Sequence, residues 1–162
     1  MIIKPINDIK SSLFKKFDCG NETLNEYLQK YAKQNEKNHL SRTYILEDEE
    51  CILGYVTLCN TQIDAKEMPP NYSKLPKYPI PGVKIARLAV DVKHQRNHIG
   101  KALLTFAFKQ IILVSASVGI KVIVVDAKEK SRQFYEKYGF ISLPNNNLTY
   151  ILPIETVLKA LL

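Results

Sequence analysis

The order of predicted elements between Arg87 and Phe140 constrains the fold of this chain most strongly. Residues 83–91 are predicted to form a strand, and apolar residues then recur at helical spacing from Ile99 to about Ser117. Residues 121–126 contain the continuous run Val122-Ile123-Val124-Val125, which is typical of a strand covered on both faces. A second helix is predicted over 129–138. A strand, a crossover helix and a second strand predict a parallel strand pair.

The other segments predict mainly antiparallel strands around this pair. Gly54 interrupts one of these strands and predicts a bulge or a close backbone approach. Residues 69–81 hold five of the eight prolines, which predicts a stiff, extended loop, either a lid over a substrate cleft or a surface connection. A helix is predicted to begin after Asn21 as its N-cap. The further strands are expected at 2–5, 43–46, 51–58, 141–143 and 149–152.

These patterns predict one α/β domain over residues 1–162. Its sheet should be mixed and mainly antiparallel, with a central parallel pair and helices on both faces. The length suits one domain with a sizeable core. No linker or internal repeat divides the sequence.

The composition indicates the cellular compartment and the kinds of ligand to expect. No run of eighteen apolar residues exists, and the N-terminus lacks the order of a secretory signal. The three cysteines form no CxxC pair, which favours a reduced cytoplasm. None of the three histidines stands in a metal-ligand spacing, so no metal, and in particular no structural zinc, is expected. The net charge of +7 lies entirely within residues 82–140, which contain 11 basic and 4 acidic residues. That surplus suits a polyanionic ligand such as RNA, or is a generic basic surface.

A turn between the strand 83–91 and the following helix offers an anion site. Its residues are Gln95-Arg96-Asn97-His98-Ile99-Gly100-Lys101. Backbone N–H groups at a helix N-terminus have no partner within the helix, so they can bind pyrophosphate oxygens. Gly100 permits a close approach, and Arg96 and Lys101 add positive charge. The alternative is an ordinary strand-to-helix turn.

Tyr135 is the candidate proton donor. A phenol with a pKa of about 10 stays protonated at neutral pH and can donate a proton. The alternative is an aromatic side chain that packs the helix against the sheet.

These segments resemble the core of the GCN5-related N-acetyltransferase (GNAT) family. Gln95 and Gly100 match the family's pyrophosphate turn, (Gln/Arg)-x-x-Gly-x-(Gly/Ala), whereas His98 stands where its first glycine is expected. Residues 131–140 are similar to the signature A-x-x-F-Y-E-x-x-G-F, with Ser131 at the alanine position.

The resemblance implies acetyl-CoA as cosubstrate and the single-domain GNAT fold, whose central parallel pair is splayed. The pantetheine arm would fill the splay and pair with the main chain of Leu88, Ala89 and Val90. The Val90 N–H would polarise the thioester carbonyl, and Tyr135 would be the general acid. The turn would bind the pyrophosphate through Gln95, Arg96, Asn97, His98, Ile99, Gly100 and Lys101. It stays open whether His98 in place of glycine weakens this binding.

The N-terminal half contains Phe17-Asp18-Cys19-Gly20, Leu24-Asn25, Ser41-Arg42-Thr43-Tyr44 and Gly54-Tyr55-Val56-Thr57-Leu58. In these residues the chain resembles one bacterial branch of the family, the acetyltransferase toxins of type II toxin–antitoxin pairs. These toxins acetylate the α-amine of aminoacyl-tRNA and block translation, and the resemblance implies a ribbon-helix-helix antitoxin and a homodimer. Lys84, Arg87, Lys93 and Arg96 are candidate tRNA contacts or, alternatively, solvated charges.

Two rival functions fit the same residues. The first is an ordinary GNAT enzyme that acetylates a small amine or a protein N-terminus. The second is a catalytically silent module that binds CoA or nucleic acid. No obvious Glu or His general base stands near the proposed site, which favours an α-amine acceptor over a lysine side chain.

Overall fold

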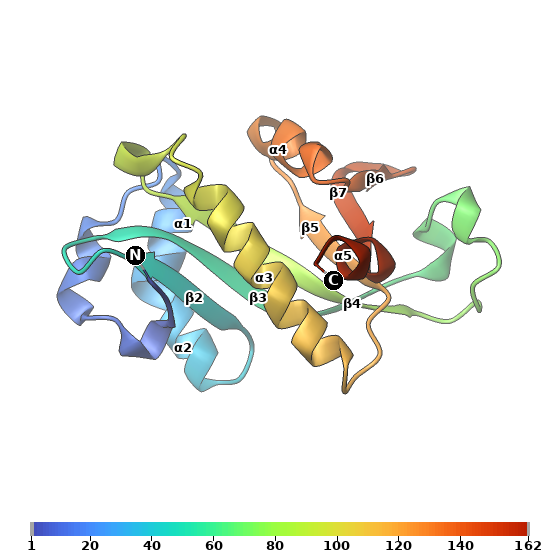
Figure 1. Cartoon of the computed structure of the whole chain (residues 1–162), viewed down its shortest axis with the longest axis horizontal. Coiled ribbons are helices and arrows are strands. Elements are labelled where there is room, and N and C mark those ends of the chain that lie inside the picture. Colours follow the sequence, from blue (N-terminus) through green and yellow to red (C-terminus); the bar gives the residue numbers. More distant parts are fainter. Residues whose placement is uncertain (1, 162) are drawn as a thin grey trace. The chain divides into compact units, whose positions relative to one another are not determined.

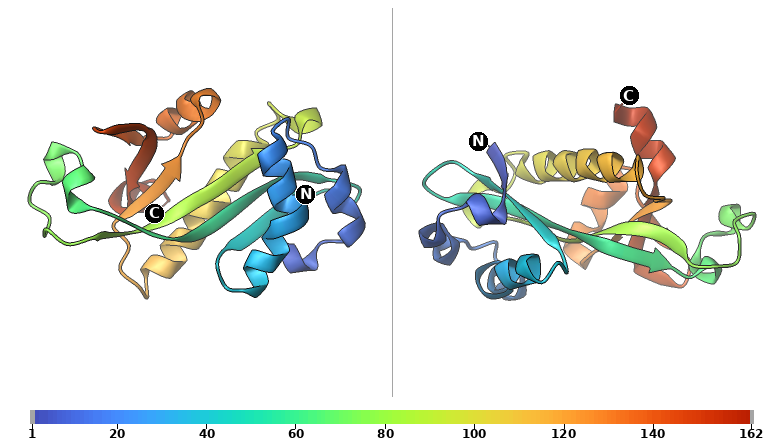
Figure 2. Two further views of the ribbon diagram at one scale, coloured as in Figure 1. Left: turned by 180° about the vertical axis from the view of Figure 1, so that it is seen from behind. Right: turned by 90° about the horizontal axis from the view of Figure 1, so that it is seen from below.

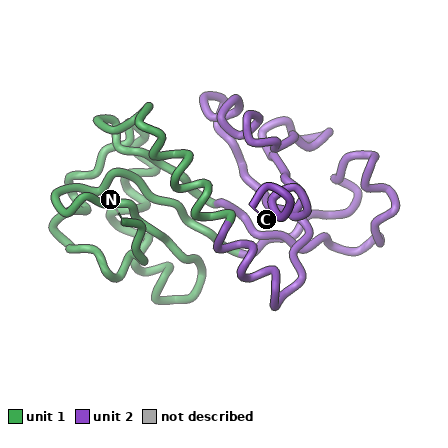
Figure 3. The backbone as a smooth tube through the Cα atoms, in the orientation of Figure 1, with its two compact units in different colours: residues 1–59, 86–108 green, residues 60–85, 109–162 purple. Residues whose placement is uncertain are grey.

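The computed structural model describes residues 2–161 and divides into two compact units (Figure 3). The first unit comprises residues 1–59 and 86–108, and the second comprises residues 60–85 and 109–162. Strands β3 (Ile52–Ile63) and β4 (Ile80–Val90) and helix α3 (Ile99–Ser115) each run from one unit into the other. No helix within residues 2–161 combines the length and apolar character that crossing a membrane requires.

Seven strands form one sheet in the order β1-β2-β3-β4-β5-β7-β6 (Figure 1). β4 and β5 pair in parallel, whereas β1 with β2, β2 with β3, β5 with β7 and β6 with β7 pair antiparallel. The predicted mixed sheet with a central parallel pair is therefore confirmed. The remaining strands are β1 (Ile2–Pro5), β2 (Arg42–Glu47), β5 (Val122–Asp126), β6 (Ile141–Leu143) and β7 (Asn146–Pro153).

In the first unit, helices cover both faces of the strands (Figure 2). Side chains alternate along β3, so Gly54 faces α3 while Tyr55 faces the opposite side. The buried Tyr55 ring packs against Phe17 and Tyr27, with ring centroids 5.6 and 6.4 Å apart. Tyr27 belongs to an almost continuous helix made of α1 (Glu22–Glu26), a π-helical turn (Tyr27–Tyr31) and α2 (Ala32–Lys37).

Asn21 caps this helix as predicted, because its side chain accepts a hydrogen bond from the Leu24 N–H. The close backbone approach expected at Gly54 is also present. A Cβ built there would lie 2.7 Å from the Ala89 carbonyl oxygen and 2.9 Å from Leu103 Cδ1. Only glycine fits between β4 and α3 at this point.

In the second unit, Val122–Val125 are buried, as expected for a covered strand. Within the proline-rich segment 69–81, Pro70–Tyr72 forms a 3-10 turn where the sequence predicted extended chain alone, and a second 3-10 turn, Ala65–Glu67, precedes the segment. Met68 is buried in the core of this unit, and Leu75 packs against that core. The segment is thus anchored by its apolar side chains, as a packed connection would be.

Several boundaries differ from the predictions. β3 continues five residues past Leu58, and β7 begins at Asn146 inside the stretch expected to be a turn. The second predicted helix consists of a 3-10 turn (Glu129–Ser131) and α4 (Arg132–Lys137). The terminal helix α5 (Ile154–Leu161) was not predicted. The other 3-10 turns are Ile6–Asp8, Ser11–Lys16 and Val92–His94.

Candidate active site

The turn before α3 presents a row of backbone donors. The first α-helical hydrogen bond runs from the Ala102 N–H to the His98 carbonyl, 3.1 Å. The N–H groups of Ile99, Gly100 and Lys101 precede that bond, so they have no carbonyl one turn earlier within the helix. They lie at the positive end of the dipole of a 17-residue helix. This arrangement suits a pyrophosphate group.

Arg96 and His98 both adopt left-handed backbone, with φ of 69° and 62°. His98 stands where the GNAT turn has glycine, and it takes the conformation that glycine favours. A residue with a Cβ pays about 1–2 kcal/mol for this conformation. Left-handed residues within a turn direct successive N–H groups into one concavity, which is an anion-binding feature. The backbone of the turn therefore fits the phosphates of acetyl-CoA despite the missing glycine.

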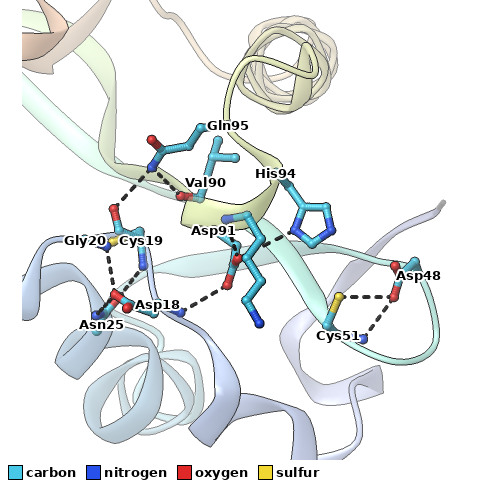
Figure 4. Close-up of polar contacts among 11 residues, drawn as sticks. Asp18, Cys19, Gly20, Asn25, Asp48, Cys51, Val90, Asp91, His94 and Gln95 are labelled. Atoms are coloured by element: carbon cyan, nitrogen blue, oxygen red, sulfur yellow. Dashed lines mark hydrogen bonds and ion pairs between the residues drawn. The ribbon is translucent and has the colours of Figure 1, made fainter.

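The Gln95 side chain stabilises the turn through hydrogen bonds to backbone carbonyls. Its side-chain Nε2 donates to the Val90 carbonyl at 3.0 Å and to the Cys19 carbonyl at 3.3 Å (Figure 4). The Gln95 side chain thus holds two segments of backbone together, and any contact it makes with a phosphate would come from its main chain.

The segment Asp18–Gly20 supports the same turn, a role that the sequence analysis did not assign to it. The buried Asp91 carboxylate accepts hydrogen bonds from the Lys93 N–H at 3.0 Å and the Asp18 N–H at 3.2 Å. The Asn25 amide donates to the Asp18 carboxylate at 2.9 Å, and the Gly20 N–H donates at 2.8 Å (Figure 4). These two bonds hold the pKa of the Asp18 carboxyl below its usual value.

The backbone of β4 alternates in direction at its C-terminal end. The Asp91 N–H donates to the Leu53 carbonyl of β3 at 2.9 Å, and the Ala89 carbonyl lies against Gly54 of β3. Since adjacent peptide groups of a strand point to opposite sides, the N–H of Val90 points away from β3. The main chain of Leu88 faces the same way. Ala89 directs its main chain toward β3, which removes it from the expected pantetheine contacts.

The parallel pairing of β4 with β5 is short. Its register runs from Gly82 opposite Val122 to Lys84 opposite Val124, whereas β4 continues to Val90. The main chain of Leu88 and Val90 thus lies beyond the paired stretch. The splayed-pair hypothesis requires these main-chain groups to be unpaired with β5, so that the pantetheine arm can bind them.

Tyr135 lies in the second unit, on α4, and is 5% exposed. Its ring contacts Phe134 and Phe140 edge-on, with centroids 5.1 and 5.5 Å apart. Burial raises the pKa of the Tyr135 phenol above its ordinary value. The phenol is therefore protonated at every physiological pH, as a proton donor must be.

The four basic residues singled out in the sequence differ in their surroundings. Lys84 forms an ion pair with Asp126. The Arg87 guanidinium lies 3.6 Å from the centre of the Tyr27 ring, a cation–π contact. The side chains of Lys93 and Arg96 are exposed beside the turn, where they can reach a phosphate.

The sequence model of the acetyltransferase (GNAT) domain matches residues 39–142, which include the turn, the end of β4 and Tyr135. The chain belongs to the GNAT family. Acetyl-CoA-dependent N-acetyl transfer is the chemistry of this family.

The substrates or ligands of several proteins similar to this GNAT chain are known. A tRNA-acetylating toxin of Mycobacterium tuberculosis is 28% identical over 137 residues, 84% of this chain and 82% of that toxin. AtaT, solved in complex with acetyl-methionyl-tRNAfMet, is 30% identical with a TM-score of 0.89, covering 99% of both chains. AtaTR bound with acetyl-CoA is 30% identical with a TM-score of 0.84, covering 99% of this chain and 98% of that one.

His98 gives a first prediction for this GNAT turn. Replacing His98 with glycine relieves the left-handed strain but adds freedom to the unfolded chain, so the free energy of unfolding should rise by about 0.5–1 kcal/mol. Because the native backbone already has the required φ, the affinity for acetyl-CoA should change by less than about fivefold. Thermal unfolding and isothermal titration measure the two quantities.

The control is His98→Ala, which removes the imidazole and keeps the Cβ strain. It should not gain stability. A tenfold tighter binding of acetyl-CoA by His98→Gly would show instead that the histidine obstructs the phosphates.

Proposed function

We propose that this chain transfers acetyl from acetyl-CoA to the α-amine of aminoacyl-tRNA and thereby blocks translation as the toxin of a toxin–antitoxin pair. The observation that carries the proposal is the full-length similarity to AtaT, whose solved structure contains acetyl-methionyl-tRNA. The similar toxin of M. tuberculosis is named for the same substrate class. In this proposal both compact units act as one N-acetyltransferase domain over residues 1–162, whose end residues 1 and 162 lie outside the described part.

The main chain performs the first part of the proposed mechanism. Acetyl-CoA is bound with its pyrophosphate on the N–H groups of Ile99, Gly100 and Lys101. The pantetheine arm pairs with Leu88 and Val90. As the amine attacks the thioester, negative charge develops on the carbonyl oxygen, and the Val90 N–H stabilises it.

Tyr135 performs the second part. When the tetrahedral intermediate collapses, the carbon–sulfur bond breaks and the thiolate of CoA takes the phenolic proton. The phenolate regains a proton from the former amine through solvent. Burial raises the pKa of the Tyr135 phenol, and it also disfavours the charged thiolate at the same place. Because donor and acceptor are affected in the same direction, burial does not prevent the proton transfer between them.

The acceptor follows from the protonation state of amines. An α-amine has a pKa of about 7.7–8.0, so a sizeable fraction is neutral and nucleophilic at cellular pH. A lysine side chain, with a pKa of about 10.4, is almost entirely protonated there and needs a base. An α-amine is therefore the acceptor that this site can use without one.

The partners follow the same similarity. AtaT has been solved with the antitoxin AtaR, and the AtaT–AtaR complex has been solved with DNA. We propose an antitoxin of the ribbon-helix-helix type and a homodimer for this chain, acting in the cytoplasm. The exposed Lys93 and Arg96 are the proposed contacts to tRNA phosphates, because Lys84 and Arg87 already have partners.

The test is transfer of labelled acetyl from acetyl-CoA to a mixed aminoacyl-tRNA pool, with polyamines and peptides assayed in parallel. Uncharged tRNA and tRNA carrying an already blocked α-amine are the matched controls. Label should appear on the charged tRNA and on neither control.

Label on polyamines or peptides alone would identify an ordinary GNAT enzyme. Nucleic-acid or CoA binding without transfer to any acceptor would identify a silent binding module. Either result contradicts the proposal.

A further inference from the structure

Three potential metal ligands meet at the end of the first unit beside the cofactor turn. Asp48 and Cys51 lie in the turn between β2 and β3, and His94 lies in the 3-10 turn that follows β4. One ligand atom from each lies within 4.8 Å of the other two. Around tetrahedral zinc the ligand atoms would stand about 3.5 Å apart, so a shift of roughly 1 Å would close the site.

The β2–β3 turn places its two ligands side by side. The Asp48 carboxylate accepts hydrogen bonds from the Cys51 N–H at 2.9 Å and the Glu50 N–H at 3.1 Å. The Cys51 thiol points at the same carboxylate oxygen, with sulfur and oxygen 3.4 Å apart. Carboxylate and thiol are thus held together before any ion arrives. Asp48 is exposed, which leaves an entry path from solvent.

His94 supplies an independent observation. Its Nδ1 is buried and has no hydrogen-bond partner among residues 2–161, and the Asp91 carboxylate lies 3.6 Å away. A buried polar nitrogen without a partner destabilises the folded state. Figure 4 shows the His94 ring between Asp91 on one side and Asp48 with Cys51 on the other.

This order matches the arrangement in which a metal-bound histidine donates its second ring N–H to a carboxylate. A small rotation of the ring would direct Nε2 to the metal and bring Nδ1 within hydrogen-bond distance of the Asp91 carboxylate. The orphaned nitrogen would then have a partner. The buried Asp91 is itself fixed by two backbone N–H groups, so it can serve as that support.

We propose that Asp48, Cys51 and His94 bind one Zn²⁺ ion, with water as the fourth ligand. A thiolate, an imidazole and a carboxylate are the ligands that zinc takes in proteins, whereas magnesium and calcium take oxygen alone. The ion takes no part in acetyl transfer. It joins the β2–β3 turn to the residue before Gln95, so it stabilises the turn that binds pyrophosphate.

No metal was expected from the sequence because no histidine has a neighbouring ligand at zinc spacing. Spacing along the sequence does not reveal the proposed cluster. Forty-two positions separate Cys51 from His94, and only the pairing of strands brings the two segments together.

The test uses the full chain, stripped with a chelator and titrated with Zn²⁺ against a chromogenic competitor. One equivalent should bind, and Co²⁺ should give the visible bands of a tetrahedral site with a thiolate charge-transfer band. Cys51→Ser and His94→Gln should each lower the affinity at least tenfold. The controls Cys59→Ser and His39→Gln change the same residue types outside the cluster and should bind as the parent does.

Hydrogen exchange gives a second readout that does not depend on the acceptor or on catalysis. Zn²⁺ should slow exchange over residues 91–98 in the parent chain and leave Cys51→Ser unchanged. Binding that survives both ligand variants, a cobalt spectrum without a thiolate band, or the lack of a stoichiometric equivalent would overturn the site. Zinc binding without any change over 91–98 would overturn its role in stabilising the turn.

Discussion

Replacing Tyr135 with phenylalanine is expected to lower kcat about 10²- to 10⁴-fold, the usual contribution of a positioned general acid. The ring contacts with Phe134 and Phe140 remain in this variant, so the core should be kept. The acetyl-CoA dissociation constant should not change, because all the contacts proposed for the phosphates and pantetheine are made by backbone. Single-turnover kinetics with labelled acetyl-CoA measure the chemical step directly.

The matched control is Tyr138→Phe, three residues further along, where the side chain is only partly buried. It removes one hydroxyl group from the same helix end and should retain turnover. Full activity of folded Tyr135→Phe would contradict the general-acid role and show that the tyrosine is only a packing residue.

Replacing Gly54 with alanine is expected to damage stability and catalysis together. The new Cβ would lie 2.7 Å from the Ala89 carbonyl oxygen, closer than such atoms approach. Relief requires the peptide between Ala89 and Val90 to tilt, at a cost of about 1–3 kcal/mol in the free energy of unfolding. That same peptide carries the Val90 N–H, and a misplaced donor costs up to about 10²-fold in rate.

Gly119→Ala is the control, because no atom lies within 4 Å of a Cβ at that position. Chemical denaturation and kcat should both report the contrast between the two variants. If Gly54→Ala lost stability but kept full kcat, the Val90 N–H would not be the oxyanion donor.

Much of the fold could be predicted because local patterns and tertiary structure agree. The runs at 122–125 and 51–58 predicted central strands, and Asn21 as an N-cap predicted a helix start. The strand ends were missed because ladder hydrogen bonds extend over polar residues such as Asn146. Helix α5 carries no capping signal that the sequence analysis used, and packing against β7 supports it.

The candidate site also has features that local sequence predicts and features that depend on tertiary structure. The order of turn, helix and tyrosine is local and could be predicted from sequence. The positive φ of His98 could not, because glycine is the residue that normally signals it. Nor could the bonds from Asp91 to Asp18 or from Gln95 to Cys19, which join segments more than seventy positions apart.

The division into two units has a practical consequence for protein engineering. The chain passes from one unit to the other at 59–60, 85–86 and 108–109, so each unit is assembled from two separate stretches of sequence. No single truncation point yields either unit whole. Truncated chains, and split-protein reporters divided at one loop, should therefore fail to fold. Fusions at the termini leave all three passages between the units intact.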